Sequence, residues 1–426
     1  MTNTSGRTGL PRVLIVAENA SAKFGGEAFL PLHYFLLLRK RGVEAFLLSH
    51  SRVRQELHAD FPDQRTHMCF IEDMRLQRAL WTARTWLPKG VASVFTAPLI
   101  GMATQTVQRS MARQIVREQR IDIVHQPAPV SPKLPSALWN IGAPVVIGPM
   151  NGGMTFPAGF TDRQAAGEGR MVAVGRASAS LMNCLVPGKR QAALLLVANQ
   201  RTRAALPTSL RRVPVEMLVE NGVDLGRFAE ASVRPHPGVP RFAFIGRLVD
   251  WKAVDILLEA LAAARRTAPI ALEIFGDGPQ RHTLQQQAAR LGLADAATFH
   301  GFVPQSELPA RLALCDALVL PSLFECGGAV VLEAMALGLP VVATAWGGPA
   351  DYLDDTCGIL IEPKSEQQLV HDLASALIRL GQDPALRECL GHAGRKKVEA
   401  EYDWDKKVDR ILTIYDRVIA EGRARV

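Results

Sequence analysis

The sequence predicts an α/β protein of two doubly wound domains, each with a parallel sheet between layers of helices. Two observations lead to this prediction. The chain has 426 residues, which is more than one hydrophobic core ordinarily supports. Short apolar runs bounded by glycine or proline alternate with segments of helical spacing, a pattern typical of buried parallel strands.

The first series of predicted strands opens with the apolar run at 12–18. A glycine turn, FGGEA (24–28), follows it, and residues 30–42 then have helical spacing and end on Gly42, which suits a C-cap. Further strands of this series are predicted at 43–50, 121–126, 144–149 and 193–199. We therefore expect an N-terminal Rossmann-like domain over residues 1–220.

The second series of predicted strands begins at 240–248. Its other members are predicted at 271–279, 297–304, 317–322 and 340–348. Residues 221–240, which lie between the two series, are rich in proline, glycine and charge, and they predict an interdomain linker. We expect the second Rossmann-like domain over residues 241–400.

Composition narrows the class of protein and of partner. The chain is 48% apolar and 21% charged, which is ordinary for a soluble globular protein. A net charge of +8 favours anionic partners such as nucleotides, phosphates or acidic lipids, although solubility alone explains it equally well. The basic residues are dispersed, without a helix-turn-helix or RNP signature, so no nucleic-acid binding is expected.

The cysteines and apolar segments indicate a cytoplasmic location. The six cysteines form neither CxxC nor zinc-finger spacing, so they read as free thiols in a reducing compartment. The apolar run at 13–17 is too short for a signal peptide. Residues 86–117 are apolar early and basic late, which would suit peripheral contact with an anionic membrane. Pro88 and Pro98 interrupt this stretch, so a core-packed helix or loop is favoured.

The glycine turns at predicted strand ends are the first places to look for chemistry, because parallel sheets bind ligands there. Gly25 and Gly26 precede a helix, whose N-terminal amides can hold an anion, although a plain tight turn is the alternative. The full GxGxxG pattern is absent, GDGP (276–279) is only a fragment of it, and no P-loop occurs. A dinucleotide oxidoreductase is therefore not expected.

Two cations follow the first strand of the second series. In GRLVDWK (246–252), Arg247 offers a planar fork of donors and Lys252 a point charge. Both suit a diphosphate beside the end of a strand. For this motif alone, a solvated cationic turn is the simpler interpretation.

The stretch PSLFECGGAVVLEAMALGLPVVAT (321–344) carries two carboxylates around a glycine turn. Gly327 and Gly328 are expected at the N-terminus of a helix, where amides are free. Glu325 in the turn can reach a sugar hydroxyl, and Glu333 in the helix can accept hydrogen bonds from a ribose diol. A glycosidase pair about 5 to 9.5 Å apart, or two unrelated surface charges, are the alternatives.

These motifs in this order resemble the retaining GT-B glycosyltransferases of family 4. The similarity covers GRLVDWK, FGDGP, FHGFVP and the glutamate segment, together with NGVDLGRF (221–228) and YDW (402–404). The N-terminal half matches only loosely. The resemblance implies two domains facing a central cleft and transfer of a sugar from a nucleotide diphosphate sugar with retention. It also implies no metal and no cofactor beyond that co-substrate.

The resemblance also implies roles for individual residues. Arg247 and Lys252 would hold the diphosphate, Glu325 the donor sugar and Glu333 the ribose. Further donor contacts would come from backbone or base-bordering positions, namely Gly25, Gly26, Phe302, Val303, Gly327 and Gly328. The last helix, over 401–426, would cross back to the N-terminal domain. The acceptor would be a glycan, a lipid-linked glycan or a cell-surface polysaccharide precursor.

One departure from the family pattern concerns the N-terminal half. Many members carry a histidine near the donor sugar after a strand that begins with a proline–valine pair. Here PVVIGPMNGGMTFP (144–157) has none, so that either a turn of amides at Asn151 and Gly152 replaces it or the acceptor pocket differs. His125 is the nearest other polar group for an acceptor or sugar contact, with a structural role as its alternative.

Other functions remain open at this stage. A sugar-nucleotide epimerase or a phosphorylase could share the GT-B fold, but no signature of a pyridoxal-phosphate lysine is evident. A non-catalytic sugar-nucleotide-binding protein is a third alternative. The complete set of Arg247, Lys252, Glu325 and Glu333 argues against a degenerate site.

Overall fold

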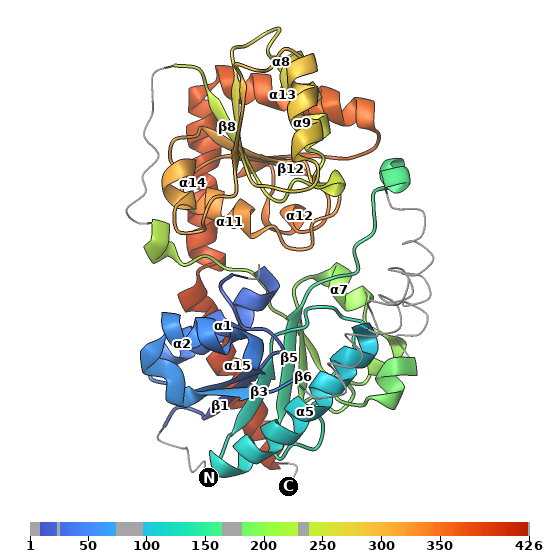
Figure 1. Cartoon of the computed structure of the whole chain (residues 1–426), viewed down its shortest axis with the longest axis vertical. Helices are drawn as coiled ribbons and strands as arrows, with labels where there is room; N and C mark the ends of the chain where they lie inside the picture. Colours follow the sequence, from blue (N-terminus) through green and yellow to red (C-terminus); the bar gives the residue numbers. More distant parts are fainter. Residues whose placement is uncertain (1–8, 24–25, 74–96, 164–180, 229–237, 425–426) are drawn as a thin grey trace, which may run out of the picture. The chain divides into compact units, whose positions relative to one another are not determined.

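The structure, a computed structural model, describes residues 9–23, 26–73, 97–163, 181–228 and 238–424 (Figure 1). The chain divides into two compact units. The N-terminal unit comprises Met1–Gly153, Gly167–Glu220 and Val408–Val426. The C-terminal unit comprises Met154–Ala166 and Asn221–Lys407.

The N-terminal unit contains a seven-stranded sheet in the order β3-β2-β1-β4-β5-β6-β7. All neighbouring strands pair in parallel. The strands are β1 (Val13–Val16), β2 (Ala45–His50), β3 (Met68–Ile71), β4 (Ile123–Gln126), β5 (Val145–Met150), β6 (Leu194–Val197) and β7 (Val215–Met217). The runs of β1 and β6 are apolar and buried throughout, because both faces of the sheet are covered there, whereas the edge strand β7 is partly exposed.

The helices of this unit cover the sheet. They are α1 (Gly26–Lys40), α2 (Arg54–Asp60), α5 (Ala97–Glu118), α7 (Gln200–Ala204) and, from Val408 onward, α15 (Trp404–Ala424), with short 3-10 turns η1 (Ser51–Val53), η2 (Pro62–His67) and η5 (Thr208–Leu210). On one face the core joins Leu14, Leu48, Val124 and Ile147 of the central strands to Ala112 of α5.

Helix α5 tests the expectation for residues 86–117. Pro98 does not interrupt a helix, because α5 begins at Ala97 and a proline is tolerated in the first turn, where no intrahelical N–H bond is lost. Pro88 lies outside the described residues. Among the helices that the structure describes, none is both long and apolar enough to cross a membrane.

The C-terminal unit contains a six-stranded parallel sheet in the order β10-β9-β8-β11-β12-β13. The strands are β8 (Arg241–Ile245), β9 (Ala271–Phe275), β10 (Ala297–Gly301), β11 (Ala317–Leu320), β12 (Val341–Thr344) and β13 (Gly358–Ile361). Strands β8 and β11 are neighbours, yet the chain continues from them toward opposite edges of the sheet. This is the doubly wound topology.

Helices flank this second sheet on both faces, as right-handed crossovers require. They are η4 (Ala158–Arg163), η6 (Leu225–Phe228), η7 (Asp250–Lys252), α8 (Val254–Ala264), α9 (Arg281–Arg290), α10 (Leu308–Leu312), α11 (Ala329–Ala336), α12 (Pro349–Tyr352), α13 (Glu366–Gln382) and α14 (Pro384–Glu401). Helix α8 packs with α9 and α13, and α11 packs with α12 and α14 (Figure 1). The predicted fold class of two doubly wound parallel-sheet domains is thus confirmed.

Two boundaries differ from the sequence prediction. The start of the expected linker is part of the C-terminal unit, since Val223 N donates to Tyr402 O at 2.8 Å and Trp404 N donates to Val223 O at 3.1 Å. Residues 229–237 lie outside the described residues. Met154–Ala166, expected in the N-terminal domain, also belongs to the C-terminal unit. Contacts between residues distant in sequence set both boundaries, so local composition does not reveal them.

Candidate functional site

The topological switch point of the C-terminal sheet lies between β8 and β11. Loops that leave neighbouring strands toward opposite edges leave a crevice at the carboxyl ends, and ligands bind there in open α/β sheets. GRLVDWK follows β8, and the segment with Glu325 follows β11. The two motifs with the strongest chemical signal therefore meet at the position that the topology favours.

Lys252 and Glu325 are brought together at this switch point. The Lys252 Nζ donates to Glu325 Oε2 in a close ion pair. Their side chains are 14% and 16% exposed, so both charges are partly shielded from water. The two loops are also joined by their backbones, because Leu323 N donates to Trp251 O at 2.8 Å. Sequence reasoning predicted both residues for the site but not their direct contact.

Arg247 lies on the loop after β8, and this loop packs closely against the glycine turn after β9. A Cβ on Gly276 would lie 1.9 Å from Gly246 O, and one on Gly278 would lie 2.3 Å from Leu248 O. Only glycine permits the two backbones to approach so closely. This packing explains why GDGP has glycines at these positions although it is not part of a GxGxxG dinucleotide-binding pattern. Arg247 itself is exposed directly after β8.

The Glu325 turn is held in place by a second glycine pair. Gly348 N donates to Glu325 O at 2.8 Å. A Cβ on Gly348 would lie 2.0 Å from Gly327 O, and one on Gly347 would lie 2.2 Å from Glu325 O. Gly328 then caps α11 with a φ of 74°, a left-handed conformation that glycine adopts readily. The N-terminus of α11, with its partial positive charge, therefore begins beside Glu325.

Glu333 lies on α11 and is half-buried. Its burial raises the pKa of the carboxyl above the ordinary value, and the hydrogen bond from Gln305 and the charge of Arg227 oppose this only in part. The Gln305 Nε2 donates to Glu333 Oε1 at 3.4 Å. A desolvated carboxylate with a single weak neutral donor is well suited to accept ligand hydroxyl groups.

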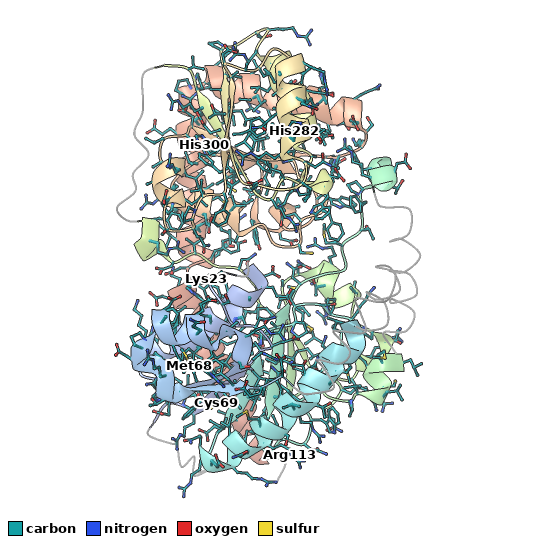
Figure 2. All side chains as sticks on the ribbon, in the orientation of Figure 1. Lys23, Met68, Cys69, Arg113, His282 and His300 are labelled. Carbon is teal, nitrogen blue, oxygen red and sulfur yellow. The ribbon has the colours of Figure 1, made fainter. Side chains whose placement is uncertain are left out.

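The loop after β10 carries the residues expected to border a base. Phe302 is 79% exposed, and Val303 is half-buried. The preceding strand end is fixed by His300, labelled in Figure 2, which stacks on Phe275 and lies 2.6 Å from Glu273 Oε2. An aromatic ring so exposed beside the Glu333 region can stack on a planar ligand.

In the N-terminal unit, the turn after β5 is closed by its own neighbours. Gly152 N donates to Thr202 Oγ1 at 3.0 Å, and Asn199 Nδ2 donates to Asn151 Oδ1 at 3.3 Å. Asn151 is 3% exposed. The expectation that this turn of amides replaces a histidine is therefore not supported for Gly152, whose amide already has a partner within the unit.

His125 is a core residue rather than an acceptor contact. Its side chain is 0% exposed. The Nε2 donates to Gly148 O at 2.5 Å, and the Tyr415 hydroxyl donates to Nδ1 at 2.6 Å. Both ring nitrogens are thus engaged inside the unit, and the structural alternative that the sequence left open is the one that fits.

The switch point of the N-terminal sheet lies between β1 and β4. Gly26 is the first residue of α1, and a Cβ built on it would meet no atom within 4 Å among the described residues beyond its chain neighbours and its own helix. Glu27 Oε1 accepts a hydrogen bond from Val130 N, after β4, at 3.0 Å. Gly25 lies outside the described residues.

Lys189 is a buried cation that the sequence did not single out. It is 1% exposed, and its Nζ donates to Ser131 O at 2.9 Å and to Pro132 O at 3.1 Å. Burial lowers the pKa of this ammonium to about 7. Pro132 in turn lies against the Asn151 turn, since its Cδ would be 2.6 Å from a Cβ on Gly152. The sequence analysis missed Lys189 because nothing in the residues around it, which include Gly188, indicates that its side chain is buried.

The depressed pKa of Lys189 predicts a pH-dependent stability. Between about pH 7 and the ordinary lysine pKa of 10.5, the unfolded chain binds more protons than the folded one. The free energy of unfolding should therefore rise with pH in this window, by at most about 1.4 kcal/mol per pH unit. Urea denaturation at pH 7 and 9 should show this rise in the wild type and lose it in Lys189→Met. An identical pH dependence in both proteins would contradict the prediction.

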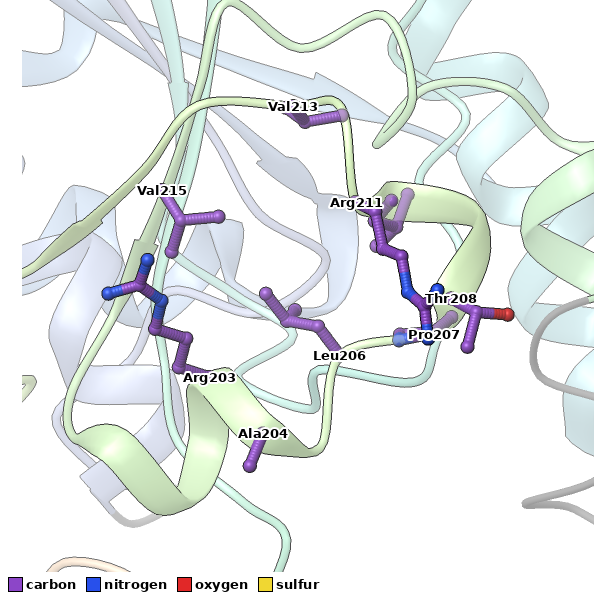
Figure 3. Close-up of a pocket in the computed structure, with 9 residues that line it drawn as sticks. Arg203, Ala204, Leu206, Pro207, Thr208, Arg211, Val213 and Val215 are labelled. Carbon is purple, nitrogen blue, oxygen red and sulfur yellow. The ribbon is translucent and has the colours of Figure 1, made fainter.

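A separate pocket of about 340 Å³ lies at the end of the N-terminal sheet (Figure 3). Its lining combines two arginines with an apolar floor: Arg203, Ala204, Leu206, Pro207, Thr208, Leu210, Arg211, Val213 and Val215. Figure 3 shows Arg203 and Arg211 on either side of Leu206. The residues predicted for donor or acceptor binding do not line it, so this pocket is separate from the candidate site.

Comparison with known proteins agrees with the fold and with the motifs of the C-terminal unit. Residues 229–397 match the family of glycosyl transferases group 1. The chain is 33% identical over 200 residues to a glycogen synthase of Mycobacterium tuberculosis, covering 46% of this chain and 47% of that protein. It is 35% identical over 260 residues to a D-inositol 3-phosphate glycosyltransferase of Salinispora arenicola, covering 53% and 55%.

Among solved structures, the sucrose-phosphate synthase of Thermosynechococcus elongatus superimposes with a TM-score of 0.66 at 18% identity, covering 96% of this chain and 100% of that one. This likeness supports the GT-B fold. The chain spans about half the length of the curated relatives it matches. The family match over residues 229–397 therefore agrees with the switch-point site and with the fold of the C-terminal unit.

Proposed function

We propose that the protein is a glycosyltransferase that moves a sugar from a nucleotide diphosphate sugar to an acceptor hydroxyl, with retention of configuration. The observation that carries this proposal is the Lys252–Glu325 pair at the β8/β11 switch point, beside the N-terminus of α11. A cation, a carboxylate and a helix N-terminus at one point match a donor whose diphosphate and sugar are adjacent.

The leaving diphosphate is the group that this site would stabilise. Lys252 and the exposed Arg247 would neutralise the charge that develops as the bond to the sugar breaks, with support from the dipole of α11. Because positive charge is supplied by the chain, the proposed reaction requires neither a metal nor a further cofactor. Glu325 would hold Lys252 through Oε2 and accept a donor-sugar hydroxyl through Oε1.

The nucleoside would be bound along α11 and the loop after β10. Glu333 would accept hydrogen bonds from the ribose hydroxyls, and Phe302 and Val303 would border the base. The backbone of Gly327 and Gly328 would approach the sugar or phosphate. Gly25 and Gly26 would cap the phosphates from the N-terminal unit; these contacts would follow when the two units close on the donor.

The proposed reaction takes place on one face of the sugar. The bond from C1 to the diphosphate oxygen breaks, and its electron pair stays with the diphosphate. The acceptor oxygen forms the new bond to C1 on the same face, and its proton passes to the departing diphosphate. No separate base residue is then needed, which agrees with the assignment of His125 to the core.

The acceptor remains the broadest part of the proposal. A glycogen synthase and a D-inositol 3-phosphate glycosyltransferase are both among the relatives, so their names do not narrow the acceptor class. We propose a glycan, a lipid-linked glycan or a polysaccharide precursor, in the cytoplasm or at the inner face of a membrane. Sedimentation with anionic vesicles tests the membrane part. An epimerase, a phosphorylase or a non-catalytic binding protein gains no support from these relatives.

Thermal unfolding with separate nucleotides tests the donor site. We expect one of UDP, GDP or ADP to stabilise the protein by about 2.7 kcal/mol at 100 times its dissociation constant. The sugar nucleotides of that base should then release the nucleoside diphosphate when an acceptor is added. Stabilisation by NAD alone, or by no nucleoside diphosphate, would overturn the proposed donor site.

A further inference from the structure

The segment Met154–Arg163, which we call the brace, is a part of the C-terminal unit that the motifs of the family match do not include. The first part of the N-terminal unit ends at Gly153. The brace begins at the next residue but belongs to the C-terminal unit. Met154 is 4% exposed and Phe160 is 3% exposed. The brace is therefore anchored by buried side chains, although about half of its residues are exposed.

The first half of the brace contacts the Glu325 turn. The Phe156 ring stacks on Phe324, the residue before Glu325, with ring centroids 5.3 Å apart and planes inclined by 27°. The Trp346 Nε1 donates to Thr155 O at 2.8 Å. These two contacts hold the brace between the loop after β11 and the loop after β12.

Met154 adds a third contact on the same side. Its Cε would lie 2.7 Å from a Cβ on Gly347, so the side chain covers this glycine closely. Gly347 itself lies directly against Glu325 O, 2.2 Å from such a Cβ. Met154, Gly347 and the backbone of Glu325 thus form one continuous stack, without space for an additional methyl group.

The middle of the brace lies on the backbone of the C-terminal unit. A Cβ on Gly159 would lie 1.9 Å from Lys364 O, so glycine alone allows this approach. Phe160 is buried in the same turn. The middle of the brace is therefore fixed to the C-terminal unit, the same unit that both of its ends contact.

The second half of the brace contacts the start of α8, just after Lys252. Arg163 donates from both terminal nitrogens to Asp255, at 3.1 and 2.7 Å, and from one of them to Glu366 at 2.9 Å. Its burial opposes the charge, but the hydrogen bonds and charges of Asp255 and Glu366 raise the pKa of the guanidinium. This forked, partly buried geometry is the strong form of an ion pair.

We infer that the brace sets the position of Glu325 relative to Lys252, and that Phe156 and Arg163 are positioning residues for the donor. One short segment holds the turn that carries Glu325 at one end and the helix that follows Lys252 at the other. Catalytic groups must be held within about 0.5 Å by supporting contacts, and displacement by 1 Å can lower a rate about 100-fold. The inference rests on the proposed function for its kinetic consequence only.

The expected effect separates catalysis from nucleotide binding. Among the residues that the structure describes, no hydrogen bond or ring contact joins the brace to Glu333 or to the loop after β10. We therefore expect Phe156→Ala and Arg163→Ala to lower kcat by roughly 10- to 100-fold. The dissociation constant of the nucleoside diphosphate, which Arg247, Glu333 and the loop after β10 would also hold, should rise by a smaller factor than kcat falls. Phe156→Tyr, which keeps the ring, should restore kcat, and Arg163→Lys, which keeps the charge but not the fork, should restore it only in part.

Kinetics of the full chain and hydrogen exchange of the free protein test the inference together. Arg395→Ala is the matched control, because Arg395 pairs with Glu399 at 2.9 Å on the exposed surface of α14 in the same unit. In both alanine variants of the brace, amides of residues 323–328 and 249–254 should exchange faster than in the wild type and the control. Unchanged exchange, or a kcat equal to that of the wild type, would overturn the inference.

The two proposals can fail separately. A wild-type protein that transfers no sugar would contradict the proposed function, and the exchange measurement would still decide the role of the brace. A loss of nucleotide binding in parallel with kcat and melting temperature would show a general loss of structure, and it would also overturn the positioning role.

Discussion

Lys252→Met is expected to lower kcat/KM for sugar transfer by about 1000-fold. Removing one group that stabilises transition-state charge typically lowers kcat by roughly 100- to 1000-fold. Methionine keeps the length of the side chain but supplies no positive charge to the leaving diphosphate. It also leaves the 16%-exposed Glu325 carboxylate without its cation, where it would repel the phosphates. Steady-state kinetics with the matched donor measure the loss.

Three further variants test whether Lys252 acts through charge and through Glu325. Lys252→Arg keeps the charge and should retain more activity than Lys252→Met. Because the two side chains are in direct contact, the double variant Lys252→Met, Glu325→Gln should lose less than the product of the single losses. A kcat/KM for Lys252→Met within about threefold of the wild type would remove Lys252 from the mechanism.

Glu333→Gln should weaken nucleotide binding and stabilise the free protein at the same time. Hydrogen bonds to a charged group contribute about 1.5–3 kcal/mol, so affinity should fall roughly 10- to 100-fold. The pKa of Glu333 is raised by burial, so the folded state disfavours the ionised carboxylate. The protonated carboxyl therefore contributes to the free energy of unfolding. This contribution is complete below the unfolded pKa near 4.5 and is lost as the pH rises through the higher folded pKa. Glutamine avoids that loss at pH 7.

Calorimetric titration and thermal unfolding of the same samples check both parts. The melting temperature of Glu333→Gln should exceed that of the wild type at pH 7, and the difference should shrink toward pH 4. Glu388→Gln, at an exposed position of α14, is the control for loss of one negative charge in the same unit. Unchanged nucleotide affinity in Glu333→Gln would contradict the ribose contact.

The fold was predictable because its main signal is local. A parallel strand buried on both faces must be apolar throughout, so runs such as those of β1 and β11 are visible without knowledge of their neighbours. The same logic reached Lys252 and Glu325. Both follow predicted strands, and the order of strands in a doubly wound sheet brings those two loops together.

What escaped prediction depends on contacts between distant residues. His125 is a core residue whose Nδ1 accepts a hydrogen bond from the hydroxyl of Tyr415, which lies 290 positions further along the chain. Lys189 is buried against a loop that accepts its hydrogen bonds through two backbone carbonyls, which no side-chain pattern in the sequence reveals. The brace residues Phe156 and Arg163 occur in a stretch without periodicity, and their importance arises only from the ring and the carboxylates that they meet.

The order of synthesis gives helix α15 a further consequence. The N-terminal unit includes Val408–Val426, so its last residues are translated after the whole C-terminal unit. Tyr415 is 0% exposed, so this late helix fills part of the core. Domains generally fold as units during translation, N-terminal first. The N-terminal unit is therefore completed only after the C-terminal unit has been synthesised, and until then the core surface that Tyr415 covers has no cover from this helix.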